Sequence, residues 1–230
     1  MANNLKQWNS LLGAILKIPG AKVNRNKFLE DELRQYCNVD TLSDILDGNN
    51  APYKVIGKDR LDKIANQRIN NNIKKAAFSS IITGLPGGTA IFATLPADLI
   101  QYYYFLFKTA QELAYLYGYP NFYDADNEFT ERSLNILTIF IGVMSNDTTT
   151  TAGLKAISKQ FIDQLDRGVF YGIAREVAKK LGLRVSQRSF STTFGKVIPV
   201  VGGLASGAIT WISFKPAATR LKKRLQEGLP

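Results

Sequence analysis

The amino-acid sequence predicts an all-α protein: a single helical domain with a central apolar layer of helical hairpins that proline and glycine break. Apolar residues recur every three to four positions along most of the 230-residue chain, which is the period of an amphipathic helix. Hydrophobic residues make up 45% of the chain and charged residues 21%, as in ordinary globular domains. Two uncharged stretches, 76–97 and 197–214, each place a proline just ahead of a glycine pair. They are long enough to be considered as membrane-crossing, but their breakers indicate bent hairpins better than straight spans.

The N-terminal fifty residues are expected to form three short helices. An apolar stripe over 5–16 predicts the first helix, which Pro19-Gly20 should end. Leucine and tyrosine positions over 29–36 predict the second. The sequence Thr-Leu-Ser-Asp at 41–44 has the form of a capping box, so the third helix should begin there and close at Gly48.

A long helix is predicted from about Lys58. Its apolar positions recur every four residues over 61–77, and its lysines and arginines lie off that stripe. This helix should run into the first apolar stretch and stop near Leu85, because a residue before proline disfavours the α region. The glycine pair of 86–88 supplies a corner, and Pro96 should restart the chain at the first position of the next helix.

That next helix follows from a regular apolar stripe over 99–117, and it should end at Gly118. Its aromatic run at 102–107 is expected to pack in a core, with an aromatic belt at a membrane interface as the alternative. A further apolar helix is predicted around 136–144, where a buried strand is the weaker alternative.

The last part of the chain predicts an amphipathic helix or helix pair over 154–181. Gly182 and the polar run 186–193 should separate it from the second apolar stretch. A basic helix at 219–225 completes the chain.

Composition excludes several classes of chemistry. The chain has no histidine, which removes Ser-His-Asp and Cys-His catalysis and the commonest metal ligand. Its single cysteine, Cys37, excludes an internal disulfide and a cysteine zinc site, and suits a reducing compartment. We therefore expect no enzyme, no cofactor and no metal site. The net charge of +10 points to an anionic partner, and the basic segments flank the apolar ones.

The candidate functional residues belong to the two apolar stretches. They are Gly84, Pro86, Gly87, Gly88, Pro96, Asp98, Pro199, Gly202, Gly203 and Gly207. The first glycines lack the pattern of a phosphate loop, so a corner or a close helix contact is expected there. The GxxxG pair at 203 and 207 would let another helix approach closely.

Two groups of acids have structural explanations. Asp98 interrupts 31 otherwise uncharged residues; it is expected to be a helix N-terminal acid, with a buried ionisable group as the alternative. Asp124, Asp126, Glu128 and Glu131 lack the glycine and the twelfth-position glutamate of a calcium loop. They are interpreted as acids at a helix N-terminus.

The runs at 79–119 and 196–225 resemble the EcsC protein family. The matching positions are glycines 84, 87 and 88, Pro-Ala-Asp-Leu at 96–99, Leu-Tyr-Gly at 116–118, and Ile-Pro followed by a glycine pair at 198–203. The resemblance covers roughly 55–225, so we divide the chain into an unassigned N-terminal helical segment, 1–50, and an EcsC-like helical domain, 51–230. The resemblance implies a helical bacterial protein associated with transport or secretion loci, and it brings no catalytic residues.

These observations predict a non-enzymatic protein that associates with anionic lipid at the cytoplasmic face of a bacterial membrane. A role as an accessory to transport or secretion is what the resemblance implies. No signal peptide is apparent, so a cytoplasmic location at the inner face of the cell membrane is expected. One alternative is a soluble oligomer or binding module that docks on a membrane protein complex or on itself. Another is an effector that inserts into membranes. Nucleic acid is not expected, because the aromatic run has few cations among its rings.

Overall fold

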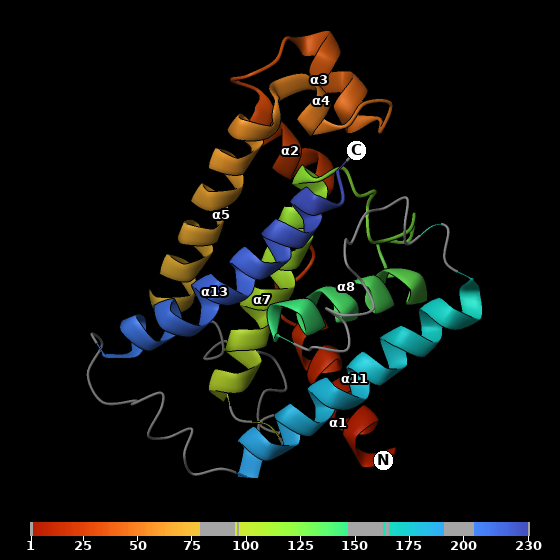
Figure 1. The fold of residues 1–230 in the computed structure, drawn as a ribbon, viewed down its shortest axis with the longest axis vertical. Helices are drawn as coiled ribbons and strands as arrows, with labels where there is room; N and C mark the ends of the chain where they lie inside the picture. The colour runs from red at the N-terminus through yellow and green to blue at the C-terminus, as the bar shows by residue number, and fades with distance from the viewer. Residues whose placement is uncertain are drawn as a thin grey trace.

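Helices pack around a central helix, α7, in the part of the chain that the structure describes (Figure 1). The structure is a computed structural model, and it describes residues 2–78, 95, 97–146, 163, 166–190 and 205–229. Within these residues no strand forms, and one isolated bridge joins Tyr123 to Phe129. The predicted all-α fold is therefore confirmed.

The helices, in chain order, are α1 (Ala2–Leu16), α2 (Arg25–Leu33), α3 (Val39–Leu46), α4 (Pro52–Ile56), α5 (Lys58–Phe78), α7 (Ala97–Leu116), α8 (Glu131–Met144), α11 (Arg167–Phe190) and α13 (Ala205–Glu227). Helix α5 begins at Lys58 as predicted. Gly48 and Gly118 follow α3 and α7 with φ of +82° and +88°, so the predicted glycine stops are confirmed. The strand alternative for 136–144 is wrong, because α8 covers it.

Helix α7 is buried on all sides over most of its length, because α1, α2, α5, α8 and α13 pack around it. Its aromatic run lies in the core: Tyr103 and Phe107 are at most 1% exposed, and Tyr104 and Phe105 at most 5%. The core prediction for this run is confirmed. A single cluster of buried residues reaches from Trp8 in α1 to Leu225 in α13, so the described helices share one core.

Helix α11 continues through Gly182, where the sequence predicts a break. The reason is close packing against α1: a Cβ at Gly182 would lie 1.7 Å from the backbone oxygen of Asn4. The glycine therefore permits a close helix crossing and does not end the helix. The polar run after it continues α11 up to Phe190, so the predicted separation is wrong to that point. Most of the preceding stretch, 154–165, lies outside the described residues.

The predicted start of the third helix is wrong. The third helix begins at Val39, because Asn38 is its N-cap and its side chain accepts a hydrogen bond from the Thr41 N–H. Thr41 itself lies inside the helix.

The interpretation of the four acids before α8 as helix N-terminal acids is wrong for three of them. Thr130 caps α8, and of the four acids only Glu131 lies in its first turn. Asp124 Oδ1 instead accepts the N–H groups of Asp126 and Glu128, at 3.1 and 3.0 Å, so it shapes the loop. Among the described residues, no group of three acids or cysteines could hold a metal ion.

The predicted hairpin layer lies outside the described residues. This applies to Gly84, Leu85, Pro86, Gly87, Gly88, Pro96, Pro199, Gly202 and Gly203. Asp98 and Gly207 are described through their backbone alone, within α7 and α13. None of the described helices combines the length and the apolarity that crossing a membrane requires.

Candidate functional site

Helices α5 and α13 lie side by side and run in opposite directions (Figure 1). Near the start of α5, Lys222 Nζ of α13 lies 2.6 Å from Asp62 Oδ1. Near its end, Gln101 of α7 donates to the Ala76 carbonyl, and the ring of Tyr102 meets that of Phe214 in α13. The end of α5 and the start of α7 flank the first apolar stretch, and Phe214 of α13 ends the second. These three parts thus lie together at one end of the bundle.

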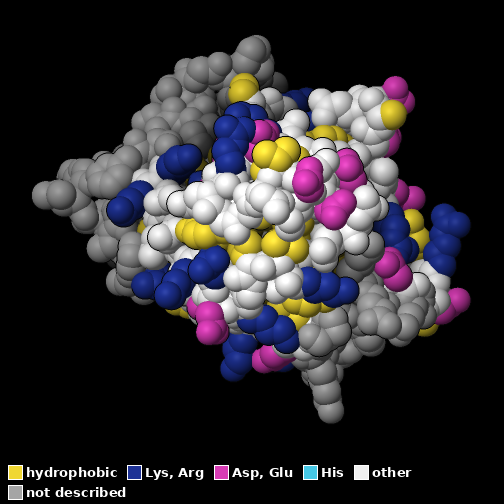
Figure 2. Space-filling view, turned by 90° about the horizontal axis from the view of Figure 1, so that it is seen from above, with side chains coloured by type: hydrophobic (Ala, Val, Ile, Leu, Met, Phe, Trp, Pro, Cys, Tyr) yellow, Lys and Arg dark blue, Asp and Glu magenta, His cyan; other side chains and the backbone are white. Residues whose placement is uncertain are grey.

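The two paired helices share an acid-free stretch. Residues 63–78 of α5 and 205–226 of α13 contain no aspartate or glutamate. Five exposed lysines lie on these stretches: Lys63, Lys74, Lys75, Lys215 and Lys223. We call this set the α5–α13 face. By contrast, the end of the molecule seen in Figure 2 carries acidic side chains among the basic ones.

Other cations of these helices point into the protein. Lys222 is only 9% exposed and bonds to Asp62 and Asn66. Arg220 donates to the carbonyl of Met144 at the end of α8, and Arg184 of α11 donates to the next carbonyl, that of Ser145. Burial lowers the pKa of Arg220, although Tyr102 opposes that shift. These arginines act as C-terminal caps of α8 and are removed from the basic surface that the sequence suggests.

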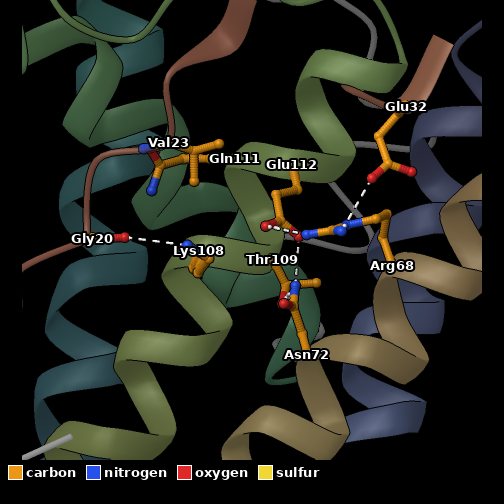
Figure 3. Close-up of polar contacts among 9 residues, drawn as sticks. All are labelled: Gly20, Val23, Glu32, Arg68, Asn72, Lys108, Thr109, Gln111 and Glu112. Carbon is orange, nitrogen blue, oxygen red and sulfur yellow. Dashed lines mark hydrogen bonds and ion pairs between the residues drawn. The ribbon is translucent and has the colours of Figure 1, made fainter. Parts of the chain in front are cut away.

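A buried polar network lies on the other side of α5 (Figure 3). Arg68 spans two carboxylates, with N–O distances of 3.0 Å to Glu112 of α7 and 3.1 Å to Glu32 of α2. Asn72, one turn further along α5, donates to Thr109 Oγ1 and Glu112 Oε2 at 2.9 and 2.5 Å. Glu112 is 1% exposed and Asn72 is fully buried. The network therefore ties α2 and α7 to α5.

Electrostatics within the network follow from burial. Burial raises the pKa of Glu32; the Arg68 charge opposes this and Glu112 reinforces it. Burial alone would lower the pKa of Arg68, but Glu112 and Glu32 more than compensate, and the pKa rises. Arg68 thus stays charged, and its guanidinium also lies over the ring of Phe28, 5.4 Å from the centroid.

A second set of α7 side chains holds the connection between α1 and α2. Tyr104, Lys108 and Gln111 follow one another at about one helical turn, and they donate to the carbonyls of residues 19, 20 and 21 in that order. Gln111 Oε1 also accepts the Val23 N–H at 3.1 Å. Figure 3 shows Lys108 directed at Gly20, away from Arg68. Burial lowers the pKa of Lys108; Glu112 raises it, and Lys75 and Arg68 lower it further.

Sequence reasoning missed the buried network. It expected Arg68 among the lysines and arginines that lie off the apolar stripe of 61–77, and it did not single out Glu112. A signal was present, because Arg68 and Asn72 lie four residues apart beside the apolar stripe of α5, and Thr109 and Glu112 lie three apart within an apolar helix. Of the residues that the sequence proposed, the structure places Asp98 in the first turn of α7. It places Gly207 in α13.

Comparison of the chain with protein-family models, with curated proteins and with solved structures found no match. The resemblance to the EcsC family therefore stays a prediction.

Proposed function

We propose that the protein is a non-enzymatic helical protein that attaches to anionic lipid at the cytoplasmic face of a bacterial membrane, as an accessory to a transport or secretion complex. One observation supports this above the others: α5 and α13, whose stretches 63–78 and 205–226 carry basic residues and no acid, lie side by side. The α5–α13 face supplies lysines to lipid headgroups. The described ends of α5 and α7 that flank the stretch 76–97 lie at the same end of the bundle as Phe214, the last residue of the stretch 197–214.

The electrostatic attraction of the five lysines to anionic lipid is strong enough for adsorption. A lysine near an anionic membrane surface contributes on the order of 1 kcal/mol, so the five lysines of the face supply roughly 5 kcal/mol. No carboxylate of the acid-free stretches opposes this attraction. Because the attraction is electrostatic, it weakens as salt shortens the screening length.

Vesicle flotation tests the proposal on the full chain. Vesicles of phosphatidylcholine with increasing phosphatidylglycerol are mixed with protein at low and at high salt. The test variant changes all five lysines of the α5–α13 face to Gln. The matched control changes five exposed cations elsewhere to Gln: Lys6, Lys17, Lys27, Arg34 and Lys54.

We expect the wild type to float with anionic vesicles at low salt and the control to float nearly as well. The test variant should remain in the unbound fraction. Equal loss in both variants would mean that net charge alone matters and that the face is not specific. Wild-type protein that remains soluble at low salt and high phosphatidylglycerol would refute membrane attachment. A single monodisperse species of that kind would favour the binding-module alternative.

A further inference from the structure

A surface hollow of about 440 Å³ opens beyond the C-terminal end of α7. Three parts of the chain line it: the start of α2, the end of α3 and the connection at 118–123. Gly48 and Gly118, both with positive φ, lie at its wall and add no side chains to fill it. The amide of Asn121 is fixed there, because it accepts from the Tyr115 hydroxyl and donates to the Tyr123 carbonyl.

Arg25 lines this hollow and is only 7% exposed. Its guanidinium donates to the carbonyls of Tyr119, Leu46 and Ile45 at 3.1, 2.7 and 3.0 Å, and to Asn26 Oδ1 at 3.1 Å. All four acceptors are neutral. Within the described ranges, no carboxylate lies within ion-pair distance of Arg25. Burial lowers the pKa of Arg25, and no carboxylate contributes to raising it.

A buried guanidinium without a counter-charge is unusual, because removing a charge from water costs several kcal/mol unless an opposite charge compensates. The carbonyl end of α3 supplies part of that compensation through its dipole. Arg68, by contrast, has two carboxylates as counter-charges, those of Glu32 and Glu112. The guanidinium has five N–H groups, and the four bonds named above leave one available.

We propose that this hollow binds a small molecule that carries one carboxylate, with Arg25 as its counter-charge. The volume admits a molecule of several heavy atoms, and the polar wall offers hydrogen bonds beside the guanidinium. Asp47 is exposed on the rim of the same hollow. Its negative charge repels anions of higher charge, so a monocarboxylate is favoured over phosphate or citrate. The proposal does not depend on membrane attachment.

Titration of the full chain with sodium acetate tests the site, followed through the 15N–1H signal of the arginine Nε groups. Sodium chloride at equal ionic strength is the reference. Asn26→Asp places a carboxylate beside Arg25, where the Asn26 Oδ1 already accepts its bond, and so supplies the missing charge from within. Asn9→Asp makes the same charge change on the exposed face of α1 and is the control.

We expect a saturable shift of one arginine signal with acetate, unchanged in Asn9→Asp and weakened at least tenfold in Asn26→Asp. Absence of a saturable shift, or the same shift with chloride, would overturn the proposal, as would equal affinity in both variants. If Asn26→Asp melts far below the wild type, Asp47→Asn provides the second test. It should strengthen acetate binding and admit phosphate, and a variant that binds neither better than wild type counts against the site.

Discussion

The crossing of α1 and α11 at Gly182 makes the sharpest stability prediction. A Cβ built there would lie 1.7 Å from the Asn4 oxygen, 2.5 Å from its carbonyl carbon and 3.2 Å from its Cα. All three atoms are backbone, so no side chain can rotate away. The helices would have to separate by more than about 1 Å, which would loosen the buried face of α1.

Gly182→Ala should therefore destabilise the protein despite the better helix propensity of alanine. Overpacking of this kind costs about 1–3 kcal/mol. For a chain of this size that corresponds to a melting temperature lowered by roughly 2–12 °C. The matched control is Gly172→Ala on the same helix, where a Cβ would meet nothing within 4 Å. There the alanine should add about 0.5–1 kcal/mol to the free energy of unfolding.

Urea unfolding followed by far-ultraviolet circular dichroism measures both variants in the same conditions. The reasoning requires opposite signs for two identical substitutions ten residues apart in α11. If Gly182→Ala is as stable as Gly172→Ala, α1 does not cross α11 at this glycine, and the described packing of α1 is refuted.

Three further changes test the polar groups of α7 and α2. Glu112→Gln leaves Arg68 with only one carboxylate in a buried site, so the free energy of unfolding should fall by roughly 3 kcal/mol, measured by urea unfolding. The raised pKa of Glu32 means that the folded state binds its proton more tightly than the unfolded state, so stability from this group falls as pH rises from about 4.5 through the folded pKa. Glu32→Gln should remove that slope in melts taken across the range, and an unchanged slope contradicts the assignment. Asp98→Asn should cost only about 0.3–1 kcal/mol through the helix dipole and leave vesicle flotation unchanged; normal stability with lost flotation would show that Asp98 serves the membrane or a partner.

Local patterns were sufficient for the helices whose buried faces repeat along one chain segment. The four-residue period of α5 places Leu61, Ala65 and Ile69 on one buried side, and burial of such a stripe is the main source of helix stability in proteins. The stops at Gly48 and Gly118 followed from the left-handed conformation that glycine adopts without strain.

Features that depend on distant residues could not be predicted in the same way. Gly182 indicates a helix break when only its neighbours in sequence are considered. In the structure it is a contact point where the backbone of Asn4, far away in sequence, leaves no room for a side chain. Arg68 and Glu112 are 44 residues apart, and each looks like a surface charge until its partner is known. Local propensity carries no information about either pairing.

The inward direction of several cations changes the expected strength of lipid attachment. Nine basic residues lie on 63–78 of α5 and 205–226 of α13, and counting all of them at about 1 kcal/mol each would give roughly 9 kcal/mol. Arg68, Arg220 and Lys222 are engaged within the protein. Arg224 is paired with Glu227 at 2.7 Å, so four of the nine are not counted. With only the five exposed lysines, the sum is roughly 5 kcal/mol, a difference of nearly a thousandfold in binding constant. Neutralising Lys222 should therefore weaken the contact of α13 with Asp62 and lower stability, while leaving the salt dependence of vesicle binding as it is. Neutralising Lys223, its exposed neighbour in sequence, should leave stability as it is and reduce the salt dependence of vesicle binding. The two variants, one residue apart, therefore distinguish lipid contact from pairing within the protein.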